Sequence, residues 1–218
     1  MIRNDYIMRL IEQFVRILSE LISKQKSLTT EQIYTELDKA AINYLSLDLE
    51  LLNKMTWTEL LHFFTHNEER DAARCYIAAE MILTYAYLNK RHMDIPEPRI
   101  KALALYLEAI TTSPELQKSE YFNKVNDVLE KVSAVEIPED LKLILFRFYE
   151  LTNEYGRAEN ILFELTELAI PDLEKIGIDF YQRLLKLSDQ ELAAGNLPRE
   201  EVQEGMQTFR QKSHLNRP

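Results

Sequence analysis

Cysteine and glycine are scarce in this sequence, and their scarcity excludes several classes of protein. Cys75 is the only cysteine among the 218 residues, so the chain cannot form an internal disulfide, and nothing points to an oxidising compartment. The 4 glycines are scattered, and the sequence contains no glycine-rich phosphate loop, dinucleotide fingerprint or Gly-x-Ser-x-Gly nucleophile elbow. We therefore expect no cofactor and no enzymatic activity of these kinds.

Long apolar runs are also missing. Charged residues interrupt the apolar ones throughout, so no stretch approaches the roughly 18 uncharged apolar residues that a membrane span needs. The N-terminal stretch MIRNDYIMRLIEQ lacks the small-residue cleavage site of a signal peptide. These two features predict a cytoplasmic protein without a membrane span.

Positive charge is in deficit. The formal net charge is -10 at pH 7, which would repel DNA or RNA unless cations gathered on one face. We therefore expect no nucleic-acid partner, and a charged partner should instead be a basic peptide or protein.

The residues that are abundant favour helix. The chain is 46% hydrophobic and has only 7 prolines besides its 4 glycines, which leaves few tight turns. Leucine, glutamate, alanine and lysine are common, and all four have high helix propensity. The composition predicts an all-α protein.

Residues 102–114, ALALYLEAITTSP, have the spacing of the second helix of a tetratricopeptide repeat. Ala102, Tyr106, Ala109 and Pro114 occupy its small, aromatic, small and proline positions. Alanines let two helices approach closely, the aromatic residue packs against the next hairpin, and proline ends the helix. The segment therefore predicts a helical hairpin, with residues 68–91 as its first helix.

A second, divergent unit follows further along the chain. Ala158, Leu162 and Leu165 repeat the spacing of four and then three residues, and Pro171 comes one residue late. A helix over residues 140–154 would precede it. We therefore predict antiparallel helical hairpins stacked as a tetratricopeptide-like right-handed α-solenoid.

The first unit departs from the repeat pattern at two places. Glu80 stands where the repeat has a small residue. The connection between the two helices is also about ten residues longer than a 34-residue repeat permits, with the excess around His92 to Pro98. That loop is a candidate functional insertion.

Residues 1–66 read as a helical cap on the repeat region, residues 67–218, in one continuous structural unit. A stack of hairpins needs a cap because its end would otherwise expose an apolar face. The helix predicted over residues 4–24 has an apolar stripe that covers its own core or, alternatively, forms a homodimer seam or lies on a membrane surface. The stripe consists of Ile7, Ile11, Phe14, Leu18 and Leu21.

The first function that we consider is a non-enzymatic scaffold that binds a protein or peptide. Stacked hairpins create a concave surface lined by the first helix of each pair. In the register above, Met81 and Tyr85 of one unit, and Arg147 and Glu150 of the other, would point into this groove.

The alternative is a metal-binding protein or an enzyme. Glu59, His62 and His66 are the best ligand candidates, because the spacings of three and four residues place them on one face of a helix. A di-iron bundle needs a second Glu-x-x-His motif, and the sequence has none. His62 is followed by Phe63, so the His-Glu-x-x-His motif of metalloproteases is absent as well.

Several segments together resemble an uncharacterised bacterial family of tetratricopeptide-repeat-like helical proteins. The resemblance implies the helical fold and no particular activity. The segments that carry it are residues 4–9 (NDYIMR), 158–160 (AEN), 180–185 (FYQRLL), 188–189 (SD) and 197–201 (LPREE).

Overall fold

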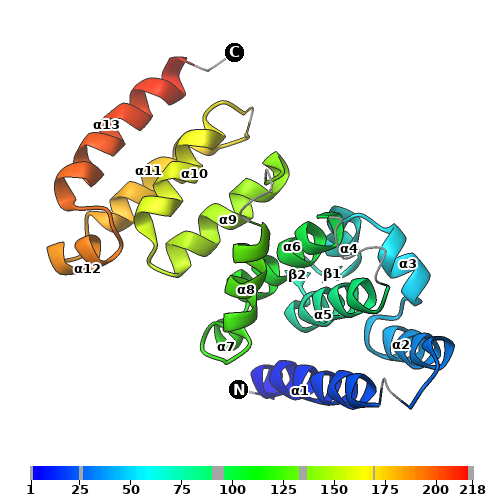
Figure 1. Ribbon diagram of the computed structural model, residues 1–218. Helices are drawn as coiled ribbons and strands as arrows, with labels where there is room; N and C mark the ends of the chain where they lie inside the picture. Colours follow the sequence, from blue (N-terminus) through cyan, green and yellow to red (C-terminus); the bar gives the residue numbers. More distant parts are fainter. Residues whose placement is uncertain (1, 25–26, 90–95, 133–136, 169, 216–218) are drawn as a thin grey trace. The chain divides into compact units, whose positions relative to one another are not determined.

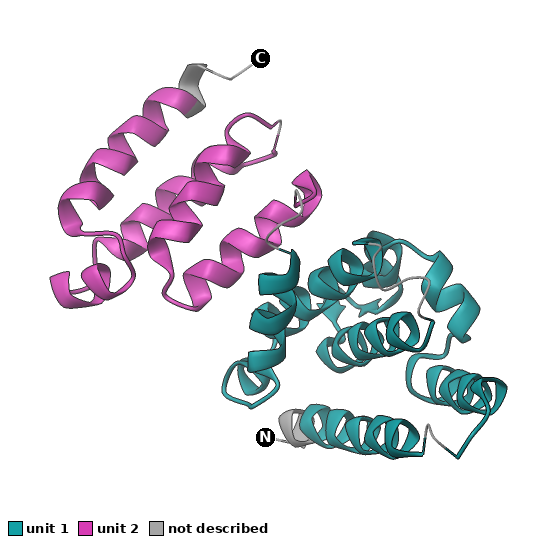
Figure 2. Cartoon of the chain, viewed as in Figure 1, with its two compact units in different colours: residues 1–136 teal, residues 137–218 magenta. Residues whose placement is uncertain are grey.

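The computed structural model describes residues 2–24, 27–89, 96–132, 137–168 and 170–215. These residues form thirteen helices and one two-stranded hairpin, which confirms the all-α prediction (Figure 1). The chain divides into two compact units, residues 1–136 and 137–218 (Figure 2).

Unit 1, residues 1–136, contains the first eight helices and the hairpin. The elements are α1 (Ile2–Ser23), α2 (Thr30–Leu45), α3 (Leu49–Lys54), α4 (Trp57–Phe63), β1 (Thr65–His66), β2 (Glu69–Arg70), α5 (Ala72–Leu88), α6 (Glu97–Thr112), α7 (Pro114–Gln117) and α8 (Phe122–Val132).

The centre of unit 1 is the hairpin of α5 and α6. Ala102 and Ala109 are fully buried, as the spacing of small residues predicts. The rings of Tyr76 on α5 and Tyr106 on α6 meet edge to face with 5.0 Å between their centroids. Because α1 and α2 also pack against α5, the predicted boundary between residues 66 and 67 falls inside unit 1.

The stripe on α1 lies in the core of its own unit. Ile11, Phe14, Leu18 and Leu21 are buried, and α1 packs against α2, α5 and α7. Burying these side chains stabilises the unit, since each buried leucine or phenylalanine contributes about 1.5–3 kcal/mol. Four of the five residues proposed as a dimer seam are therefore covered within one chain, and Ile7 is half-buried.

The start of α5 differs from the prediction of a helix beginning at residue 68. Asn67 and Glu68 have positive φ angles, 50° and 66°, and they form the two-residue turn between β1 and β2. The helix begins only at Ala72, where the side chain of Asp71 caps it by accepting a hydrogen bond from the Arg74 amide at 3.0 Å. This small hairpin was not predicted from the sequence.

Glu80, the departure from the repeat pattern, is a buried carboxylate with a partner. It is 7% exposed, and one of its oxygens lies 2.5 Å from the Lys124 ammonium. The ion pair joins α5 to α8. The cation from α8 offsets the cost of burying the carboxylate.

Unit 2, residues 137–218, contains the remaining five helices. These are α9 (Glu139–Leu151), α10 (Tyr155–Leu165), α11 (Leu173–Leu184), α12 (Asp189–Ala194) and α13 (Arg199–Leu215).

Unit 2 is built from two pairs of helices. The second predicted hairpin corresponds to α9 and α10, which pack together, and Ala158 on α10 is fully buried. The other pair is α11 and α13, and the ring of Phe209 on α13 covers Gly177 on α11 so closely that a Cβ would lie 2.2 Å from it. The core is aromatic, with Phe146 and Phe180 meeting edge to face at 5.2 Å.

Candidate functional site

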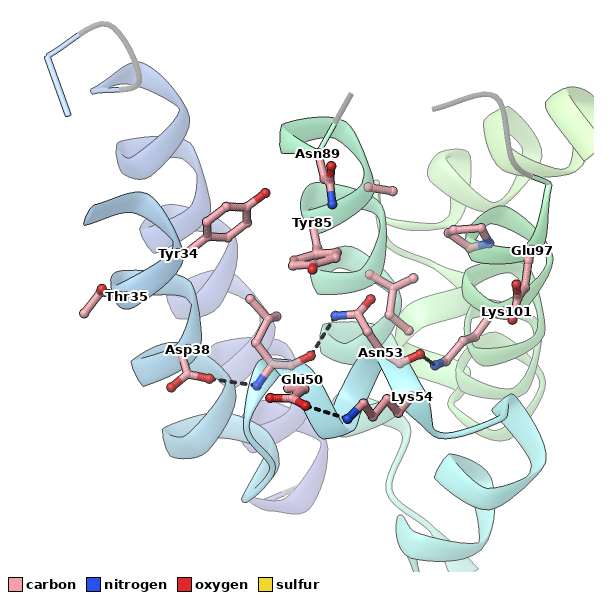
Figure 3. Close-up of a pocket in the computed structure, with 14 residues that line it drawn as sticks. Tyr34, Thr35, Asp38, Glu50, Asn53, Lys54, Tyr85, Asn89, Glu97 and Lys101 are labelled. Carbon is pink, nitrogen blue, oxygen red and sulfur yellow. Dashed lines mark hydrogen bonds and ion pairs between the residues drawn. The ribbon is translucent and has the colours of Figure 1, made fainter. Parts of the chain in front are cut away.

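A cavity of about 830 Å³ lies in unit 1 between α2, α3, α5 and α6 (Figure 3). Its size falls within the range of ligand pockets, about 300–1,000 Å³. It is lined by Tyr34, Thr35, Asp38, Leu49, Glu50, Asn53, Lys54, Ile82, Tyr85, Ala86, Asn89, Glu97, Pro98 and Lys101.

Two tyrosines from neighbouring helices form its aromatic wall. The ring centroids of Tyr34 on α2 and Tyr85 on α5 are 5.6 Å apart, with the ring planes tilted by 49° (Figure 3). Tyr34 follows Ile33, which anchors α2 in the core, so it lies at the edge of the buried stripe. Both rings are partly exposed, and burial raises the pKa of Tyr34. The pair presents aromatic surface to a ligand.

The opposite side of the cavity contains Lys101 of α6, which is only 7% exposed. Its ammonium donates hydrogen bonds to three carbonyl oxygens at the end of α3, those of Leu52 at 2.7 Å, Asn53 at 3.1 Å and Met55. A cation is favourable there because helix C-terminal carbonyls are unpaired and carry partial negative charge.

Burial lowers the pKa of Lys101 to about 8. A buried lysine with a low pKa in a cavity is often a nucleophile or general base. Here all three N–H groups of the ammonium donate hydrogen bonds to carbonyl oxygens. These contacts give Lys101 a structural role, because they attach α3 to α6.

The other end of α3 is held by carboxylates. Asp48 caps the helix by accepting from the Leu51 amide at 2.6 Å, and Asp38 of α2 accepts from the Leu49 amide at 2.8 Å. Asn53 donates to the Leu49 carbonyl at 2.7 Å. These bonds orient the short helix so that Asp38 and Asn53 border the cavity (Figure 3).

Three further charged residues border the cavity. Glu50 and Lys54 form an exposed ion pair at 2.5 Å along α3. Glu97 lies in the first turn of α6, where the helix dipole favours a negative charge. The negative charge of Glu97 raises the pKa of Lys101 and so opposes the effect of burial on this lysine.

The four predicted groove residues have different environments. Tyr85 lines the cavity, whereas Met81 is fully buried in the core of unit 1, which corrects the prediction that it points into a groove. Arg147 is exposed on α9 in unit 2. Glu150 accepts two hydrogen bonds from Arg183, at 2.6 and 2.9 Å, so its carboxylate is already paired. A groove shared by Tyr85, Arg147 and Glu150 stays a prediction.

The proposed metal ligands have simpler roles. Glu59 belongs to a capping box at the start of α4, where it accepts hydrogen bonds from the Thr56 amide at 2.8 Å and the Thr56 hydroxyl at 2.9 Å. These bonds lower the pKa of Glu59. His62 and His66 are exposed. Within the described parts of the chain, no three His, Cys, Asp or Glu side chains lie close enough together to hold a metal ion.

Two other features stand out in the sequence, Cys75 and the loop from His92 to Pro98. Cys75 is fully buried, and burial raises the pKa of its thiol, which disfavours the reactive thiolate. In the loop from His92 to Pro98, residues 92–95 lie outside the described residues. Pro96 and Pro98 begin α6, and Pro98 also borders the cavity.

Several cavity residues were missed by sequence reasoning. Tyr34, Asp38 and Asn53 come from helices assigned to the cap, and none of them belongs to a recognisable motif. Lys101 carried the one available signal, because it is a lysine inside the strongly apolar segment 100–107. A lysine in such a segment is expected either to reach the surface or to have a buried hydrogen-bond acceptor.

None of the helices in the described ranges combines the length and the apolar character needed to cross a bilayer.

No curated protein and no solved structure matches the chain. A protein-family model does match it, over residues 1–214, and its description is a family of unknown function, DUF6483. The match covers almost the entire chain, so this protein belongs to the DUF6483 family, a family of unknown function.

Proposed function

We propose that this protein is a non-enzymatic helical scaffold that binds a protein or peptide partner in the cavity between α2, α3, α5 and α6. The observation that carries the proposal is the pair of partly exposed tyrosines, Tyr34 and Tyr85, on the wall of a cavity of about 830 Å³. Partly exposed tyrosines are common anchors in interfaces because they combine a large apolar surface with a polar tip.

A tetratricopeptide-like arrangement of the hairpins is part of this proposal. The buried alanines of α6 and α10, Ala102, Ala109 and Ala158, support it. Proteins built from such hairpins present extended surfaces for peptides rather than enclosed reaction centres. A cytoplasmic location is also part of the proposal and is consistent with a single, buried cysteine.

The contacts of the most reactive residue types favour binding over catalysis. The ammonium of Lys101 is used by three carbonyl oxygens, Glu59 by the cap of α4, and Cys75 has no exposed surface. The cavity therefore offers shape, aromatic surface and hydrogen-bond acceptors. The metal-dependent alternative has less support, because Glu59 has a structural role and the two histidines are exposed.

A peptide selection tests the proposal. A phage-displayed random peptide library is selected on the wild-type protein, and binding of the recovered peptides is measured by fluorescence anisotropy. Tyr34→Ala and Tyr85→Ala should each weaken binding about tenfold, as expected for an aromatic anchor that a bound partner covers.

Tyr87→Ala is the matched control. Tyr87 is on the same helix as Tyr85, is 53% exposed and does not line the cavity, so its replacement should leave binding unchanged. Thermal unfolding of each variant shows whether the fold is intact. Recovery of no peptide, or only of peptides whose affinity is the same for all three variants, would exclude this cavity as the binding site.

A further inference from the structure

The described charged groups that border the cavity have partners within unit 1. Glu50 pairs with Lys54 at 2.5 Å, and Asp38 accepts a hydrogen bond from a backbone amide of α3 at 2.8 Å. Lys101 donates to the carbonyl oxygens that end α3 and faces the negative charge of Glu97. Each of these side chains is thus engaged by a neighbour on the cavity wall.

The uncharged polar side chains on α2 and α5, by contrast, retain hydrogen-bond donors. The hydroxyls of Tyr34 and Tyr85 and the side-chain amide of Asn89 line the cavity, and none of them forms a hydrogen bond with a described residue. Asn89 lies one turn beyond Tyr85, and both side chains extend to the same side of α5 (Figure 3). A hydroxyl donates one hydrogen bond and an amide donates two, so this wall can serve several acceptors of a ligand.

Aromatic and apolar surface surrounds these donors. The rings of Tyr34 and Tyr85 lie 5.6 Å apart and are tilted by 49°, so together they form an angled surface. Ile82, Ala86 and Pro98 add apolar lining from α5 and α6. A complementary ligand therefore has apolar ridges and, between them, carbonyl oxygens that are not already hydrogen-bonded.

Peptide conformations differ in whether their carbonyl oxygens are available. An α-helix uses nearly all of its own carbonyls in internal hydrogen bonds. A β-strand binds by joining the edge of a sheet, whereas the walls of this cavity are helices. A polyproline II helix has no internal hydrogen bonds, and its three residues per turn present ridges of proline rings. Only the last of these combines unpaired carbonyls with apolar ridges.

We infer that the occupant of this cavity is a proline-rich segment of a protein partner, bound in the polyproline II conformation. This inference rests on the proposed function and specifies the class of peptide that is recognised. Proline rings of the segment pack on the faces of Tyr34 and Tyr85, and its carbonyl oxygens accept hydrogen bonds from the two hydroxyls and from the Asn89 amide. Because proline restricts the free peptide, less conformational entropy is lost on binding, and a few contacts suffice.

The test uses peptides recovered on the wild-type protein whose binding is lost with the Tyr34→Ala/Tyr85→Ala double variant. We expect these peptides to be enriched in proline, and replacement of an enriched proline by alanine should weaken binding about tenfold. A fluorescently labelled polyproline peptide of about ten residues is the defined probe and should bind the wild-type protein. A glycine-serine peptide of the same length has the same number of carbonyls without the rings or the fixed conformation, and it should not bind.

Hydroxyl variants of the protein supply the second readout. Tyr34→Phe and Tyr85→Phe keep the rings and remove the donors, and they should leave the melting temperature unchanged because neither hydroxyl bonds to a described residue. Each should weaken binding of the polyproline peptide about three- to tenfold, which corresponds to the loss of one hydrogen bond. Tyr87→Phe is the matched control, because it removes a hydroxyl from the same helix as Tyr85 but outside the cavity.

The possible outcomes separate the two proposals. If tyrosine-dependent peptides are recovered but lack enriched proline, or keep their affinity when proline is replaced by alanine, the proline inference is wrong and the binding function stands. The same holds if the polyproline peptide does not bind, or binds both phenylalanine variants as tightly as the wild-type protein. If no recovered peptide depends on the tyrosines, both proposals fail.

Discussion

The ammonium of Lys101 on α6 donates a hydrogen bond to the carbonyl oxygen of Leu52 on α3 at 2.7 Å, across 49 positions of sequence. With the Asn53 carbonyl at 3.1 Å, this contact satisfies the end of a helix of only six residues. So short a helix is not stable by itself. Its place on the cavity wall therefore depends on a residue from another helix.

Replacing Lys101 should destabilise unit 1. Lys101→Met keeps the alkyl stem but leaves three carbonyl oxygens without their donor, two of them partly buried, and we expect a loss of about 2–4 kcal/mol in the free energy of unfolding. Chemical denaturation measures the change. Lys54→Met removes an exposed lysine from α3 itself and should change the stability very little; equal effects of the two variants would contradict the role given to Lys101.

The hairpin turn offers a stabilising substitution. Glu68 has a φ of 66°, which is unfavourable for a residue with a Cβ. Glu68→Gly should increase the free energy of unfolding by about 0.5–1 kcal/mol after the greater entropy of glycine in the unfolded chain is subtracted. Glu68→Ala, which removes the side chain and keeps the Cβ, should bring no such gain. A thermal melt that shows equal gains for both variants would trace the effect to the side chain instead.

Glu159 should make the stability of unit 2 depend on pH. Burial raises the pKa of this carboxyl above 4.5, although the Tyr181 hydroxyl donates a hydrogen bond to it at 2.7 Å and opposes the rise. The folded state thus binds the proton more tightly than the unfolded state. The resulting stabilisation is fully present below the unfolded pKa and is lost as the pH rises through the folded pKa.

Glu159→Gln keeps the acceptor for Tyr181 and removes the titration. Its free energy of unfolding should fall less than that of wild type as the pH rises from about 4.5 to 7. Tyr181→Phe removes the bond that favours the carboxylate, so it should make the pH dependence steeper. Denaturation curves across this range measure both effects, and parallel profiles for wild type and Glu159→Gln would contradict the assignment.

The role of α1 can be separated from dimer formation by two substitutions. Leu18 is 4% exposed, so Leu18→Glu should destabilise unit 1 by about 3 kcal/mol or more through an unpaired buried charge. Ile17 is 36% exposed, and Ile17→Glu should leave the fold intact. Light scattering on the Ile17 variant then tests whether the exposed side of α1 contributes to a homodimer. A Leu18→Glu variant that folds normally would show that the apolar stripe does not belong to the core of unit 1.

Only part of the candidate site could be predicted from the sequence. Tyr85 was identified from the repeat register and does line the cavity, but Met81, four residues earlier, is buried because the apolar hairpin of α5 and α6 is covered by α1 and α2. The register gives the face of a helix, and it does not show which neighbour covers that face. Tyr34 and Asp38 were missed because their importance depends on packing against α5 and α3.

The sequence by itself determined the helical composition, the two hairpins with their buried alanines and the apolar stripe of α1, because helix propensity and periodicity are local properties. Only the tertiary structure decided which of these surfaces stay open. Lys101, Asp38 and Tyr34 gained their roles when α6, α2 and α3 met, since a hydrogen bond between residues distant in sequence depends on the packing of whole helices.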